Sequence, residues 1–159
     1  MSRTNRDVRE EEFCMSLGGM FPENMEGLSI SCHPTSIYID VPVRLPHIGV
    51  FKKLNEKPVS EAREFWQRVM LYLVEGKEFP KLSKRPWVLI VCRTKDFDRD
   101  AGNHHIKPLM NAINDARLLR DKAKIKLVII NIKHDNSTGI LITDDPMEIN
   151  SKIKNEETR

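Results

Sequence analysis

Residues 87–115 of the chain, WVLIVCRTKDFDRDAGNHHIKPLMNAIND, join a strand to a helix and decide the fold. Residues 87–92 are apolar without alternation, which is typical of a strand that is buried on both faces. In the second half of the stretch the apolar residues recur with the helical period, so an amphipathic helix follows. Pro108 is tolerated because it falls in the first turn of that helix, whose N-cap would be Asn103 or His104.

On the N-terminal side of this stretch the sequence predicts another strand and another helix. Residues 36–43 alternate apolar and polar side chains, which indicates a half-buried strand. A long helix is expected from an N-cap at Ser60 to a stop near Gly76. The apolar face of this helix would be formed by Ala62, Phe65, Trp66, Val69, Met70 and Leu73, which we expect in the core.

On the C-terminal side two β-rich runs predict a hairpin. Residues 126–133 and 140–143 are rich in β-branched and apolar side chains, and residues 135–139 between them have the composition of a turn. The order is then strand, helix, strand, helix and hairpin. This order predicts an α+β fold, in which a small mixed β-sheet packs against two main helices.

Charge divides the chain into a basic body and two acidic ends. Residues 27–143 hold 20 Lys and Arg against 12 Asp and Glu, whereas residues 1–26 hold 3 against 6 and residues 144–159 hold 3 against 5. We expect a flexible N-terminal arm over residues 1–26, a single domain over 27–143 and a frayed, polar C-terminal tail over 144–159. A basic body suits a polyanionic partner such as nucleic acid.

The remaining composition is that of an ordinary globular protein. With 159 residues, 40% of them hydrophobic and 31% charged, the chain is about one domain long. No apolar run approaches the roughly 18 residues of a membrane span, and no hydrophobic signal segment opens the chain, so we expect a cytoplasmic protein without a membrane partner. Cys14, Cys32 and Cys92 lack the spacing of a zinc site and are expected to be reduced thiols.

Three aspartates alternate directly after the strand of residues 87–92. In an extended chain Asp96, Asp98 and Asp100 would point to the same side. Clustered carboxylates repel one another unless a cation compensates, and Mg²⁺ prefers such oxygen ligands. The spacing alone also fits a solvated loop. Lys107 at the start of the next helix and Asp121 before the following strand, which we expect to return to the same place, favour a metal site.

The sequence here resembles the RusA-like family of Holliday-junction-cleaving nucleases. Members of that family carry D-x-D-N or D-x-G-N after a central strand, then a lysine commonly within K-P-L-x-D-A-L, and a pair of acids about one helix later. The corresponding stretches of this chain are Asp98-Arg-Asp100-Ala-Gly-Asn103, Lys107-Pro-Leu-Met-Asn-Ala-Ile113 and Asp121-Lys122-Ala-Lys-Ile125. The similarity extends from Ile37 to about Thr143.

The resemblance implies a homodimeric, Mg²⁺-dependent endonuclease that resolves four-way DNA junctions by paired nicks, with Mn²⁺ as an alternative ion. Asp98, Asp100 and Asp121 would be the metal ligands, and Lys107 would complete the catalytic set as a phosphate contact. Two registers stay open, one with Asp98 and Asp100 as the acidic pair and one with Asp100 followed by Gly102. The expected DNA-binding residues are Lys52, Lys53, Lys57, Asn103, His104, Lys122 and Lys124.

Two departures from the family pattern leave a second hypothesis open. Lys122 stands where the second acid of the usual pair is found, and Asn111 stands in place of the helix acid. Fewer carboxylates weaken metal binding. His104 and His105 would compensate as ligands of Mn²⁺ or Zn²⁺, but we favour the alternative that they are partly exposed helix-start residues or phosphate contacts. The alternative is therefore a RusA-like protein that binds branched DNA or a protein partner without cleaving it.

Overall fold

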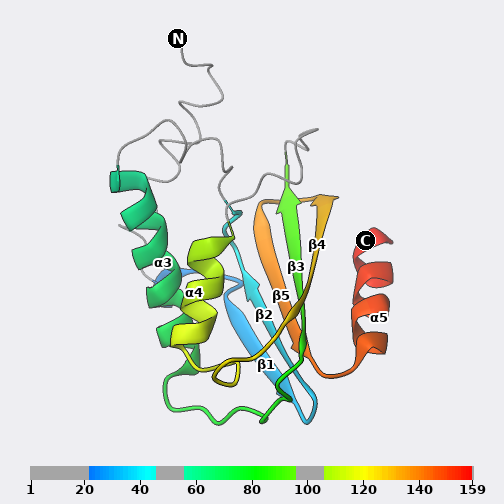
Figure 1. Cartoon of the computed structure of the whole chain (residues 1–159). Coiled ribbons are helices and arrows are strands. Elements are labelled where there is room, and N and C mark those ends of the chain that lie inside the picture. Colours follow the sequence, from blue (N-terminus) through cyan, green and yellow to red (C-terminus); the bar gives the residue numbers. More distant parts are fainter. Residues whose placement is uncertain (1–21, 46–55, 96–105, 159) are drawn as a thin grey trace.

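The computed structural model describes residues 22–45, 56–95 and 106–158 (Figure 1). In chain order the elements are the 3-10 helix η1 (Pro22–Asn24), β1 (Ser29–His33), β2 (Ser36–Val41), α3 (Glu56–Val74), β3 (Trp87–Thr94), α4 (Lys107–Asp115), β4 (Lys126–Lys133), β5 (Ser137–Thr143) and α5 (Pro146–Glu157). The described strands form one sheet in the order β1-β2-β5-β3-β4. Its neighbours are antiparallel except for β3 and β4, so the predicted α+β fold with a mixed sheet is confirmed.

The sheet is covered on both faces, with α3 and α4 on one side and α5 on the other (Figure 1). This arrangement explains the unbroken apolar run of β3. Val88, Ile90 and Cys92 point into the larger core under α3 and α4. Leu89 and Val91 point into a smaller core under α5. The prediction of a strand buried on both faces is therefore confirmed.

The apolar face expected for α3 is buried as predicted. Its six core residues, Ala62, Phe65, Trp66, Val69, Met70 and Leu73, are each at most 3% exposed. Gly76, with a positive φ of 69°, follows the helix end as expected. The predicted N-cap at Ser60 is wrong, because the helix already begins at Glu56. Pro58 does not prevent this earlier start, since a proline in the first turn removes no hydrogen bond that the helix would make.

The predicted hairpin of β4 and β5 is also wrong. Strand β3 lies between them, paired in parallel with β4 and antiparallel with β5. Both β3 and β5 are buried over most of their length, so both need neighbours on either side. Strand β4 has no buried residue and carries a lysine at each end, which suits an edge of the sheet.

The structure contains elements that the sequence did not predict. Strand β1 is mostly exposed and pairs with β2 at the other edge of the sheet. Helix α5 occupies the region expected to be a frayed tail and adds a third α-helix to the two that were predicted. The end of the expected N-terminal arm, from Pro22 on, packs against the domain: Pro22 is buried and Met25 contacts the core.

Helix α5 escaped prediction because a charged residue occupies its buried face. Asp145 caps the helix by accepting a hydrogen bond from the Met147 N–H at 2.9 Å. Of its residues, Ile149 and Glu156 are buried. The apolar stripe is thus interrupted by a carboxylate whose partner lies on another element. None of the described helices is long and apolar enough to cross a membrane.

Candidate functional site

The turn between β4 and β5 holds the end of β3, from which the predicted site begins. The His134 N–H donates to the Thr94 carbonyl at 3.1 Å. The Lys95 N–H donates to Asn136 Oδ1 at 2.9 Å. The chain therefore leaves the sheet from a defined point. The predicted site residues Asp98, Asp100, Asn103 and His104, as well as Lys52 and Lys53, lie outside the described residues, and Lys57 lies in the first turn of α3.

Helix α4, the next described element after β3, begins at Lys107. Its N-cap is Ile106, in a helical conformation and without a side-chain capping bond, so the predicted cap at Asn103 or His104 is wrong. Pro108 falls in the first turn as predicted. Lys107 is exposed at this helix start, which lies toward the end of the sheet where β3 finishes (Figure 1). A lysine beside uncapped N–H groups favours an anion at this position.

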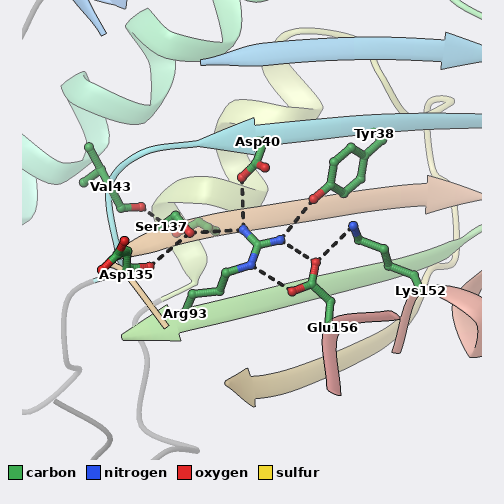
Figure 2. Close-up of polar contacts among 9 residues, drawn as sticks. Tyr38, Asp40, Val43, Arg93, Asp135, Ser137, Lys152 and Glu156 are labelled. Carbon is green, nitrogen blue, oxygen red and sulfur yellow. Dashed lines mark hydrogen bonds and ion pairs between the residues drawn. The ribbon is translucent and has the colours of Figure 1, made fainter. Parts of the chain in front are cut away.

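A buried ionic cluster lies below the end of β3 on the α5 face (Figure 2). Arg93 is 1% exposed. Its Nε and Nη2 donate to the two carboxylate oxygens of Glu156 at 3.0 and 2.6 Å. Its Nη1 donates to Asp40 at 3.0 Å and to Ser137 at 3.1 Å, and Nη2 also donates to the Tyr38 hydroxyl at 3.1 Å. All five guanidinium donors are therefore used.

The surroundings of Arg93 are adapted to its bulk and charge. A Cβ atom on Gly139 would lie 2.9 Å from Arg93 Nη2, so glycine leaves the space that the guanidinium fills. Lys152 pairs with Glu156 at 3.0 Å and lies over the Tyr38 ring, 4.2 Å from its centroid. With every donor of Arg93 satisfied, the cluster attaches α5 to the sheet and leaves no guanidinium N–H for a ligand.

Protonation of Glu156 is strongly affected by this cluster. Burial raises the pKa of its carboxyl, but hydrogen bonds from Arg93 and Lys152 outweigh burial and lower the pKa from 4.5 to about 2. The opposite balance holds for Arg93, where burial lowers the pKa but bonds to Glu156 and Tyr38 raise it overall. Both groups are therefore charged at neutral pH. Sequence reasoning missed the cluster, although an arginine on the same strand face as Leu89 and Val91 is the signal for it.

Asp121 lies at the end of the sheet where β3 begins, opposite to the end from which the chain leaves β3 toward Asp98 and Asp100. It is part of the turn closed by the Ala123 N–H, which donates to the Arg120 carbonyl at 3.1 Å. This turn precedes β4, whose first residue pairs with Trp87, the first residue of β3. Since β3 is eight residues long, its two ends are about 25 Å apart.

The structure therefore does not bear out the expected return of Asp121 to the exit of β3. Helix α4 runs back alongside β3, so the chain that leaves one end of the sheet comes back to the other (Figure 1). Lys107 is the first residue of α4, which is about 13 Å long, and Asp121 lies beyond the other end of that helix. Lys122 and Lys124, two of the expected DNA-binding residues, are exposed and lie in the same connection between α4 and β4 as Asp121.

A metal site cannot be assembled from the described residues alone. Within residues 22–45, 56–95 and 106–158, no group of three or more His, Cys, Asp or Glu side chains could hold a metal ion. The expected ligands Asp98 and Asp100 lie outside those ranges. Cys92, which is buried, is a free thiol, and burial raises its pKa to about 12. Such a thiol is protonated and unreactive at neutral pH.

Comparison with known proteins adds no family to these observations: no family model, no curated protein and no solved structure matches the chain. Its function is therefore inferred from the residues of this chain and from their positions.

Proposed function

We propose that this protein is a metal-dependent endonuclease that resolves four-way DNA junctions by paired nicks. The observation that carries the proposal is the passage from strand β3, which has a neighbour on each side, to helix α4. Between them the sequence supplies alternating aspartates, and the helix opens with an exposed lysine and a proline. Paired nicks in a two-fold symmetric substrate call for two equivalent sites, so the proposal includes a homodimer.

Each residue has a separate role in the proposed reaction. Asp98 and Asp100 would hold a divalent ion, for which carboxylate oxygens are suitable donors. Such an ion would supply an activated water and charge stabilisation at the phosphate. Lys107 would orient and neutralise the scissile phosphate from the start of α4. Asp121 is excluded from this set because of its position beside the start of β3.

A second candidate is a protein that binds branched DNA without cutting it. The position of Asp121 favours this alternative, because it leaves two carboxylates where the family pattern has three or four. Two carboxylates can suffice for a Mg²⁺ site, because Mg²⁺ often binds one or two carboxylates together with water and substrate phosphates. The two candidates therefore differ in whether Asp98 and Asp100 support turnover.

Cleavage of an end-labelled four-way junction in Mg²⁺ or Mn²⁺ tests the proposal. We expect Asp100→Asn to reduce the rate by about 100-fold or more through loss of a ligand charge, and Lys107→Ala by about tenfold or more through loss of a phosphate contact. Asp121→Asn is the matched control and should leave the rate within about threefold, because Asp121 lies at the other end of the sheet.

Three outcomes would contradict the proposal. Junction binding without cleavage in either metal would support the second candidate. Equal losses in Asp100→Asn and Asp121→Asn would contradict the assignment of the ligands. A species that stays monomeric in sedimentation velocity at the assay concentration would contradict the paired nicks.

A further inference from the structure

Two basic segments that are distant in the sequence lie side by side at the end of the sheet where β3 and β4 begin. Residues 81–86 precede β3, and residues 117–126 connect α4 to β4. The Lys124 N–H donates to the Lys84 carbonyl at 2.7 Å, and the Lys126 N–H donates to the Pro86 carbonyl at 2.9 Å. We call the cationic side chains of these two segments the basic patch.

Buried leucines hold both segments against the core. Leu82, Leu118 and Leu119 are 3%, 4% and 8% exposed. The eight Lys and Arg side chains of the two segments are all exposed. The backbone beneath the basic patch is therefore anchored while its charges face the solvent.

The charge of the basic patch is largely uncompensated. Against its eight cations stand Asp121, within the patch, and Asp144, whose carboxylate accepts the Ser83 N–H at 3.0 and 2.9 Å. Within the described residues, no cation of the patch forms an ion pair with a carboxylate within 4 Å. A surface on which cations so outnumber acids attracts polyanions.

Two cations of the patch occupy backbone positions that disfavour them. Arg117 and Lys122 have φ values of 60° and 59°. Glycine or asparagine is usual in this left-handed region, where other residues carry a penalty of about 1–2 kcal/mol. Placing cations at both positions adds positive charge to the patch at the expense of stability. Strained residues of this kind concentrate at functional sites.

We infer that the basic patch binds the sugar-phosphate backbone of duplex DNA, at a distance from the proposed cutting site. Duplex DNA carries a negative charge for about every 1.7 Å of its axis, so it can engage several of these cations together. A lipid surface fits less well, because the leucines among the patch residues are buried and unable to enter a bilayer. The patch lies about 25 Å from the end of β3, so it would hold a DNA arm away from the branch point.

The choice of DNA as the polyanion rests on the proposed function, whereas the charge and anchoring of the basic patch do not. Binding is therefore measured in EDTA, where no metal-dependent cutting occurs. A protein that binds through the patch but never cleaves would then refute the proposed function and leave this inference intact.

The test compares two triple variants that remove the same charge. The patch variant is Lys84→Gln, Arg120→Gln and Lys124→Gln. The control variant is Arg63→Gln, Lys77→Gln and Lys154→Gln, three exposed cations outside the patch. Affinity for a labelled duplex and a labelled four-way junction is measured between about 50 and 200 mM salt.

We expect the patch variant to bind both DNAs about tenfold or more weakly at the lowest salt, and the control variant to stay within about threefold of the parent. The slope of log affinity against log salt should fall by roughly 0.9 for each lost phosphate contact. Equal losses in the two variants would overturn the inference, since net charge alone would then explain them. Unchanged binding in the patch variant would overturn it, as would preferential binding of the parent to phosphatidylserine vesicles.

Discussion

Arg93 is the residue on which the packing of α5 against the sheet depends most. Burying a charge is unfavourable by several kcal/mol unless partners compensate, and breaking such a pair destabilises proteins by about 3–5 kcal/mol. Arg93 meets this requirement through Glu156 and Asp40, with Tyr38 and Ser137 as neutral acceptors. These partners come from three elements besides Arg93's own strand, so one side chain couples β2, β5 and α5 to β3.

The cluster makes the stability of the protein sensitive to acid. Because the folded-state pKa of Glu156 is about 2 and its ordinary value is 4.5, its ionised form stabilises the fold by about 3 kcal/mol. The sign follows from the lowered pKa: the contribution is complete above the ordinary value and is lost as pH falls toward 2. Urea unfolding of the parent and of Glu156→Gln should therefore show a stability difference that narrows by about 3 kcal/mol over this range.

Glu157→Gln provides the matched control for this pH dependence. Glu157 is exposed and next to Glu156 in the sequence. Its substitution should change the free energy of unfolding by at most about 0.5 kcal/mol at any pH. A difference between the parent and Glu156→Gln that does not vary with pH would show that the carboxylate is not held ionised by Arg93.

At the scale of single elements, the end of α4 contains a strained residue whose replacement should be stabilising. The Leu118 N–H donates to the Ile113 carbonyl and the Arg117 N–H donates to the Asn114 carbonyl, which is the Schellman pattern. Arg117 occupies its left-handed position, with a φ of 60°. We expect Arg117→Gly to raise the free energy of unfolding by about 1 kcal/mol, measured by urea titration.

Arg120→Gly is the control for that substitution. Arg120 is an exposed cation of the same connection, and it is not among the described residues with positive φ. Glycine there should destabilise the protein, because it adds freedom to the unfolded chain without relieving strain. A gain of stability in both variants would mean that removal of like charge, rather than relief of the backbone, is responsible.

The elements could be predicted where one periodic pattern decided the structure. The apolar face of α3 around Trp66 and the unbroken apolar run of β3 are such cases. Prediction failed where a distant partner decided it. In the sequence, Glu156 of α5 has the pattern of a solvated acid, because its partner Arg93 is distant. The neighbour of β4 could not be predicted either, because β3 inserts between β4 and β5.

The candidate site could likewise be predicted only where neighbouring residues in the sequence decide it. Lys107 could be placed at an exposed helix start after an internal strand because strand, lysine and proline are close together in the sequence. The position of Asp121 could not be predicted in this way, because it depends on the direction in which α4 runs back along the sheet. The basic patch was also missed as a unit, since its two segments are brought together by the parallel pairing of β3 and β4.

For the whole molecule, α5 should be indispensable. A chain that ends after Asp144 would expose Leu89, Val91 and Leu141 and would leave Arg93 without Glu156. Loss of one partner of a buried pair together with this apolar exposure is comparable with the total stability of a domain, about 5–15 kcal/mol. We expect the truncated chain to lose its cooperative thermal transition in circular dichroism, whereas a chain that ends after Glu157 should keep it.

The central position of β5 also determines when the protein can fold during synthesis. Strand β5 follows the other four strands in the sequence, yet it joins β2 to β3 in the middle of the sheet. Until it has left the ribosome, the nascent chain can form the pairs β1–β2 and β3–β4 but not the sheet that unites them. Contacts so distant in sequence slow folding. While β5 is still missing, the facing edges of β2 and β3 are unpaired, and such edges are templates for aggregation during translation.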